Sequence, residues 1–188
     1  MKKIFGTLCS KSFLILLFFF FVQNMALSYE TVLIDFPNNG WHRVFYEDRV
    51  KEAIVQYVPT GQTKNNYIET VIFHSYKWEH DANMTPKSVL KYQLSQTALR
   101  YRDIELSYLK DDSMDTMAIW CSKTASQCEV IRVSQGYEGI ITMHYINNNP
   151  QYFQSICSTW VNIIKKVRIY YSYYRWDVIM NKSSTVQL

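Results

Sequence analysis

The sequence predicts an α+β domain in which an antiparallel β-sheet has two amphipathic helices packed on it. Most of the predicted strands follow one another through short polar turns, which is typical of an antiparallel sheet. Only residues 85–100 and 150–166 repeat apolar side chains at helical spacing. A parallel sheet would need a long crossover, usually a helix, between its strands, and this chain does not provide enough of them.

Four strands are expected before the first helix: Tyr29–Phe36, Trp41–Tyr46, Glu52–Val58 and Tyr67–Tyr76. Each is rich in β-branched or aromatic residues or alternates apolar and polar ones, as strands do. Turn residues separate them, including Pro37 to Gly40, Pro59 and the polar loop 60–66.

The first helix is predicted to begin at Thr85 and Pro86 and to run to about Arg100. Thr is a good N-cap, and Pro fits the first helical turn. The second helix is expected to follow Asn147 to Pro150. Its apolar face comprises Phe153, Ile156, Cys157, Trp160, Val161 and Ile164.

Five further strands are predicted after the first helix: Ile104–Leu109, Met114–Cys121, Cys128–Val133, Ile140–Ile146 and Arg168–Tyr174. Of these, Cys128–Val133 and Ile140–Ile146 form the best-specified hairpin, because their connection at 134–139 contains two glycines. His144 alternates with Met143 and Tyr145, so it is expected to point away from them.

The N-terminal residues 1–28 match a signal peptide. Lys2, Lys3 and Lys11 precede the apolar run Phe13–Val22, and Ala26 and Ser28 stand at the −3 and −1 positions of a cleavage site. A membrane span needs about 20 apolar residues, so an uncleaved anchor is the less favoured alternative. The protein is therefore expected to be exported, either periplasmic or secreted.

Residues 29–180 are predicted to form a single domain, and the small polar residues 181–188 a flexible tail. The full chain has a net charge of +4, but removal of 1–28 takes away three lysines and leaves 17 basic against 16 acidic residues. Without a basic block, nucleic acid is not an expected partner, and no stable membrane span is expected after cleavage. Oligomeric state is left open.

Three cysteines remain after signal removal, in a compartment that favours disulfides. Cys121 and Cys128 flank a polar loop between two predicted strands, where facing side chains come close enough to bridge. This pair is the first choice, with other pairings or no bridge left open, and Cys157 is expected to be a buried helix thiol. The Cys-x6-Cys spacing does not fit a zinc site.

No catalytic or cofactor motif is present. The glycines are scattered, and no Gly-x-Ser-x-Gly sequence occurs. We therefore expect no cofactor and no metal. A hydrolase site would have to be assembled from distant residues, with His74 or His144 as candidates.

The last predicted strand is aromatic on both faces, from Tyr170 to Trp176. Exposed Tyr, Trp and Arg are favoured at protein interfaces. Tyr171, Tyr173 and Arg175 are therefore the predicted binding residues. The alternative is an edge strand covered by the tail.

The stretch from Trp41 to Tyr57-Val58-Pro59-Thr60-Gly61-Gln62, continuing through 66–71, resembles a pattern in uncharacterised exported proteins of Gram-negative bacteria. Trp120-Cys121 and the segment 138–145 also resemble them, so the likeness covers roughly 40–165. It implies a periplasmic or secreted α+β domain. It implies no activity and transfers no functional residues.

These observations favour a non-enzymatic exported protein that binds another envelope or secreted protein. A small secreted hydrolase and a small-ligand carrier are the alternatives. A cluster of titratable groups in a deep pocket would favour the hydrolase. An enclosed apolar cavity would favour the carrier.

Overall fold

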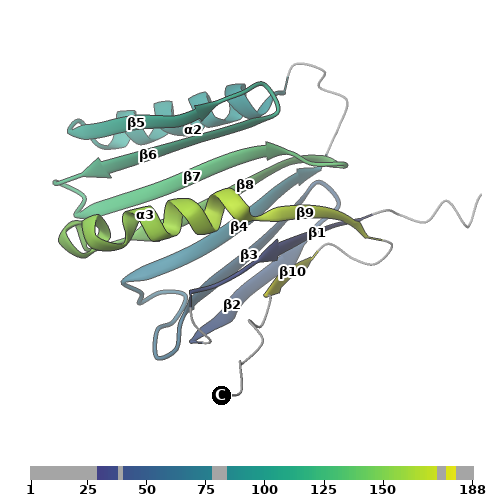
Figure 1. Ribbon diagram of the computed structural model, residues 1–188, viewed down its shortest axis with the longest axis horizontal. Helices are drawn as coiled ribbons and strands as arrows, with labels where there is room; N and C mark the ends of the chain where they lie inside the picture. The colour runs from purple at the N-terminus through teal and green to yellow at the C-terminus, as the bar shows by residue number, and fades with distance from the viewer. Residues whose placement is uncertain (1–28, 38–39, 78–83, 173–176, 181–188) are drawn as a thin grey trace, which may run out of the picture.

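A computed structural model describes residues 29–37, 40–77, 84–172 and 177–180. The side chains of Tyr29 and Ser172 are not described. These residues contain ten strands, which form two sheets, and two helices (Figure 1). The predicted signal peptide 1–28 and the predicted tail 181–188 lie outside the described residues.

The larger sheet has seven strands, and every neighbouring pair is antiparallel. In spatial order they are β2 (Trp41–Asp48), β3 (Glu52–Pro59), β4 (Glu69–Lys77), β8 (Gly139–Asn147), β7 (Gln127–Gln135), β6 (Asp115–Ser122) and β5 (Ile104–Asp111). Two runs of consecutive strands, β2–β4 and β5–β8, therefore meet where β4 pairs with β8 (Figure 1). The predicted α+β class and the antiparallel sheet are confirmed.

A second sheet of three strands was not expected from the sequence. It consists of β10 (Asp177–Met180), β1 (Tyr29–Ile34) and β9 (Arg168–Ser172). β1 pairs antiparallel with β9 but parallel with β10. The prediction of a single antiparallel sheet is thus wrong for these segments, because β1 leaves its sequence neighbours and takes both of its partners from the C-terminal end of the chain.

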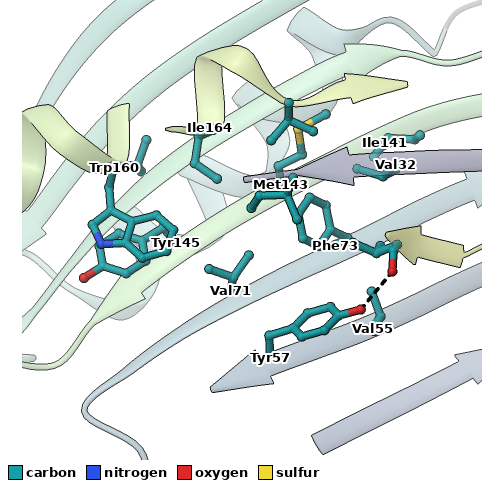
Figure 2. Packing of buried hydrophobic residues seen from close by; sticks show 14 of the residues in the cluster. Val32, Val55, Tyr57, Val71, Phe73, Ile141, Met143, Tyr145, Trp160 and Ile164 are labelled. Carbon is teal, nitrogen blue, oxygen red and sulfur yellow. Dashed lines mark hydrogen bonds between the residues drawn. The ribbon is translucent and has the colours of Figure 1, made fainter. Parts of the chain in front are cut away.

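The main core cluster brings together residues of the large sheet, of α3 (Pro150–Lys166) and of the small sheet. Figure 2 shows Val32 of β1 and Trp160 and Ile164 of α3 over strand residues such as Phe73 and Met143. The Trp160 ring stacks on Tyr145 at a centroid distance of 3.9 Å. The Tyr57 hydroxyl donates to the carbonyl oxygen of Val178 at 3.1 Å, which ties β10 to β3 (Figure 2).

α3 begins where the sequence predicts. The Asn149 side chain accepts a hydrogen bond from the Tyr152 N–H at 3.1 Å, and Pro150 occupies the first turn. The buried residues Phe153, Trp160 and Ile164 recur at helical spacing. This helix therefore presents its predicted apolar face to the core.

α2 (Pro86–Arg100) also has its predicted limits, with a Thr85–Ser88 capping box. Val89, Leu90 and Leu94 pack in a second cluster with strand residues including Trp120 and Ile140. The apolar face of α2 is narrow, because Tyr92 and Leu99 are exposed. The two clusters use alternate residues of the same strands, such as Val130 in one and Ile131 in the other, so they lie on opposite faces of the large sheet.

Arg132 of β7 joins two strands to the end of α3. Its guanidinium donates to both carboxylate oxygens of Asp115 on β6, at 2.8 and 3.3 Å. Nη1 also donates to the carbonyl oxygens of Ile164, Lys165 and Val167, at 2.8, 3.1 and 2.9 Å. These carbonyls lie at the C-terminal end of α3, where the regular helical donors run out, and the Ile164 oxygen also accepts the Val167 N–H at 3.3 Å.

We expect Arg132→Met to lower the free energy of unfolding by about 3 kcal/mol, since it leaves a partly buried carboxylate and helix-end carbonyls without their donor. Urea denaturation measures the loss. The matched control is Lys87→Met, which removes the exposed ion pair with Asp111 and should cost less than about 1 kcal/mol. Equal losses in the two variants would contradict the role given to Arg132.

Candidate functional site

Five polar side chains line up across four neighbouring strands, on the α2 side of the large sheet. They are Glu52 of β3, His74 of β4, Thr142 and His144 of β8, and Glu129 of β7. We call this set the polar row. Register places them together, because His74 is the direct cross-strand partner of Thr142.

Hydrogen bonds run along the polar row. His74 Nε2 lies 3.0 Å from Glu52 Oε2. His144 Nε2 lies 2.9 Å from Thr142 Oγ1, and its Nδ1 lies 2.5 Å from Glu129 Oε1. His144 therefore stands between a hydroxyl and a carboxylate, the order of groups found in acyl-transfer triads.

The burial of Thr142 argues against catalysis by this arrangement. Thr142 is 0% exposed, and Glu129 is only 6% exposed. A nucleophile must reach the carbonyl carbon of a substrate, and the Thr142 hydroxyl has no exposed surface. The contacts of His144 and Thr142 instead satisfy polar groups that the fold buries.

The surroundings of His74 shift its pKa. Burial lowers the pKa of His74, and the nearby His144 adds to this effect, whereas the Glu52 carboxylate opposes it. The His74 ring also lies 4.0 Å from the Tyr76 ring. Both histidines that the sequence named as hydrolase candidates thus meet on one face, but each is engaged by a carboxylate.

A small cavity of about 210 Å³ adjoins the polar row at Glu129. It lies between the C-terminal end of α2 and the strands β6 and β7. Its lining consists of Gln96, Thr97, Arg100, Tyr101, Trp120, Gln127 and Glu129. Sequence reasoning missed this site, because its residues come from three separate segments with no shared motif.

The predicted binding residue Tyr171 lies on β9 and is 47% exposed. The ring of Tyr137, which is 64% exposed, meets it edge-on at 5.5 Å. We call these two residues the tyrosine pair. Tyr173 and Arg175, the other two predicted binding residues, lie outside the described residues.

Glu30 of β1 holds the tyrosine pair together. It is the cross-strand partner of Tyr171, and its Oε1 accepts the backbone N–H of Glu138 at 2.6 Å. Burial raises the pKa of the Glu30 carboxyl, and the backbone N–H of Glu138 opposes that rise. A Cβ on Gly136 would collide with the Glu30 carboxylate, so a larger residue there would force that carboxylate to move. The turn carrying Tyr137 is therefore fixed beside β9.

Cys121 and Cys128 form a disulfide, which is the pairing that the sequence favoured. The two residues face each other across β6 and β7, with their Cα atoms 4.1 Å apart. Cys157 is a half-buried thiol at the edge of the main core, and burial raises its pKa. It is less buried than the sequence suggested.

Within residues 29–37, 40–77, 84–172 and 177–180, no group of three or more His, Cys, Asp or Glu could hold a metal ion. In the same part of the chain, no helix is long and apolar enough to cross a membrane.

No model of a known protein family matches the chain, and no significant match was found among curated proteins. The resemblance built on Trp41 to Gln62 therefore stays a prediction. Its residues do have structural roles: Pro59 ends β3, Gly61 has a φ of +89°, and the Gln62 side chain accepts the Ile68 N–H at 2.6 Å.

Removal of the disulfide should destabilise the fold by about 2–3 kcal/mol, the chain-entropy value for so short a loop. A reductant should cause this loss in the native chain and no loss in the double variant Cys121→Ala/Cys128→Ala. Chemical denaturation with and without dithiothreitol measures both, with Cys157→Ala as the control that keeps the reductant effect. An effect of reductant on the double variant would refute the assignment.

The lowered pKa of His74 predicts a pH-dependent stability. Between the folded-state pKa and the ordinary value of 6.5, the unfolded chain binds more protons, so the free energy of unfolding falls as pH falls. We expect His74→Gln to lose stability less steeply than the native chain between about pH 7 and pH 5. Urea denaturation across this range measures the slopes, and His42→Gln, at an exposed position, should keep the native slope. An unchanged slope in His74→Gln would contradict the prediction.

Proposed function

We propose that this chain is an exported, non-enzymatic protein that binds another envelope or secreted protein through the surface around the tyrosine pair. The observation that carries the proposal is the exposed contact between Tyr137 and Tyr171. Tyrosine supplies a large, rigid contact area at low entropic cost and is enriched among interface hot spots.

The surroundings of the tyrosine pair support this proposal. Tyr170 is 42% exposed, and the Arg168 guanidinium lies 5.6 Å from its ring centre. Arginine and aromatic residues are enriched at interfaces, whereas most other charged residues are depleted there. Because Glu30 and Gly136 fix the turn that carries Tyr137, the surface is preorganised, and little ordering entropy is lost on binding.

Two features support export. The first 28 residues have the order of charges, apolar run and small residues of a signal peptide. The described part of the chain contains a disulfide, which is typical of oxidising compartments.

The layered arrangement supports a binding role over the alternatives. We infer that the large sheet is covered by α3 and the small sheet on one face and partly by α2 on the other, which leaves polar groups at its centre. The buried Thr142 speaks against the hydrolase alternative. A carrier of apolar ligands would need an apolar cavity, and the cavity beside α2 is lined largely by polar side chains.

The test is a crosslinking pull-down of the processed protein from its native envelope, with partners identified by mass spectrometry. We expect one stoichiometric partner, reduced at least about tenfold in Tyr137→Ala/Tyr171→Ala, since hot-spot truncations cost this much or more. Tyr171→Ala/Tyr173→Ala/Arg175→Ala tests the surface predicted from the sequence. Tyr92→Ala removes a tyrosine that is 65% exposed on α2 and should leave capture unchanged.

Recovery of the protein without a partner would overturn this proposal. The same partner captured equally by the double variant would assign binding to another surface and would also count against it.

A further inference from the structure

β5 is an open edge of the large sheet. Among the described residues it pairs with β6 alone, and every residue from Glu105 to Asp111 is exposed (Figure 1). An edge strand presents backbone N–H and C=O groups that can pair with another strand. Three large apolar side chains of β5 are also in contact with solvent: Leu106 is 41%, Tyr108 57% and Leu109 45% exposed. β5 therefore offers both backbone hydrogen bonds and apolar surface to an added strand.

The other sheet edges in the described part of the chain are less open. β2 has a bulge between Arg43 and Phe45, and Asp177 holds the Arg43 side chain at 3.2 Å. The described parts of β9 and β10 are only five and four residues long. Bulges, charges and short strands are common means of blocking an edge. On β5 the charged side chains are each neutralised by an ion pair within the chain: Glu105 with Lys123, Lys110 with Asp115 and Asp111 with Lys87.

The apolar side chains of β5 continue the cluster that α2 covers. Leu106 lies opposite Trp120, and Tyr108 lies opposite Ala118, both of β6. Trp120 and Ala118 belong to the cluster beneath α2, and opposed residues point to the same face of a sheet. Ile104 packs against the same cluster, two residues before Leu106. Ile104, Leu106 and Tyr108 thus form a row on the α2 side, which we call the apolar stripe.

The geometry of β5 allows the apolar stripe to pair with its own copy. Two-fold symmetry makes such a pairing antiparallel and isologous. Because opposed side chains share a face, the pairing must be centred on one residue. The register of β5 with β6 shifts between Tyr108 and Lys110, so the regular backbone runs from Ile104 to Tyr108. The middle residue of that segment is Leu106.

A centre at Leu106 also matches the chemistry of the side chains. It sets Leu106 against Leu106 and Ile104 against Tyr108 of the second copy, apolar against apolar. On the opposite face it sets Glu105 against Ser107, so no like charges meet. A centre at Glu105 would oppose two carboxylates, and a centre at Ser107 would extend the pairing into the bulge at Leu109. The occupant that fits this edge is therefore a second copy of the chain.

We propose that two copies of this chain associate through β5, whose strands pair antiparallel about a two-fold axis at Leu106 and join the two large sheets into one. The pairing is short and lies at the small end of specific interfaces, so the dimer is reversible. It uses a different strand from the tyrosine pair and does not depend on the proposed protein partner.

Sedimentation equilibrium of the processed protein at micromolar concentrations tests the association. We expect a monomer–dimer equilibrium. Leu106→Lys/Tyr108→Lys should raise its dissociation constant at least about tenfold, because it replaces the apolar stripe with like charges. The matched control Tyr92→Lys/Leu99→Lys makes the same two replacements on α2, where the side chains are 65% and 79% exposed, and should keep the native constant. Far-UV circular dichroism checks that both variants fold.

Disulfide trapping tests the register. In a Cys157→Ala background, Leu106→Cys should form an intermolecular disulfide on mild oxidation, because opposed Cα atoms in an antiparallel pair lie about 4.5–5.5 Å apart, within disulfide reach. Tyr108→Cys is the control on the same strand. In the proposed register the two copies of residue 108 are offset by four residues, or about 13 Å along the strand, which is too far to bridge.

The proposal is overturned if the protein is monomeric at every concentration, which includes the case in which β5 pairs with a strand of a different protein. It is also overturned if the two double-lysine variants behave alike, since the dimer would then use another surface. Crosslinking of Tyr108→Cys as readily as Leu106→Cys would likewise overturn it.

Discussion

The structure depends on one constraint, that successive residues of a strand point to opposite faces of the sheet. On β8, Met143 and Tyr145 enter the main core, and Thr142 and His144 therefore face α2. Because four neighbouring strands keep the same alternation in register, the large sheet acquires one apolar face and one face with polar groups at its centre. The core and the polar row are two consequences of a single backbone geometry.

This division sets how each face is closed. The apolar face is covered by side chains that interlock, such as Trp160 stacked on Tyr145, and dispersion and burial are sufficient there. At the C-terminal end of α3, backbone carbonyl groups need hydrogen-bond donors, and Arg132 supplies them. Burial alone would raise the pKa of Asp115, but hydrogen bonds from Arg132, Lys110 and Ser134 outweigh it and lower that pKa overall. The Asp115 carboxylate thus stays ionised and holds Arg132 beside the carbonyl groups at the C-terminal end of α3.

Local signals explain what the sequence could predict. The limits of α2 and α3 follow from caps and prolines, and the Cys121–Cys128 pair follows from the closeness of two strands joined by a short loop. Other features depend on pairings distant in sequence. The parallel contact between β1 and β10 joins the two ends of the domain, and nothing in either segment specifies its partner. Similarly, the carboxylates Glu52 and Glu129 could be assigned to His74 and His144 only once the strand register was known.

Glu129 connects the polar row to the cavity beside α2. Its Oε1 contacts His144 Nδ1, and the same side chain lines the cavity beside Trp120. Because Glu129 is almost fully buried, water does little to satisfy its carboxylate, and the contact with His144 supplies a partner inside the protein. The polar row is therefore best explained as a set of buried groups that satisfy one another, and its Thr142 hydroxyl is too deeply buried to react.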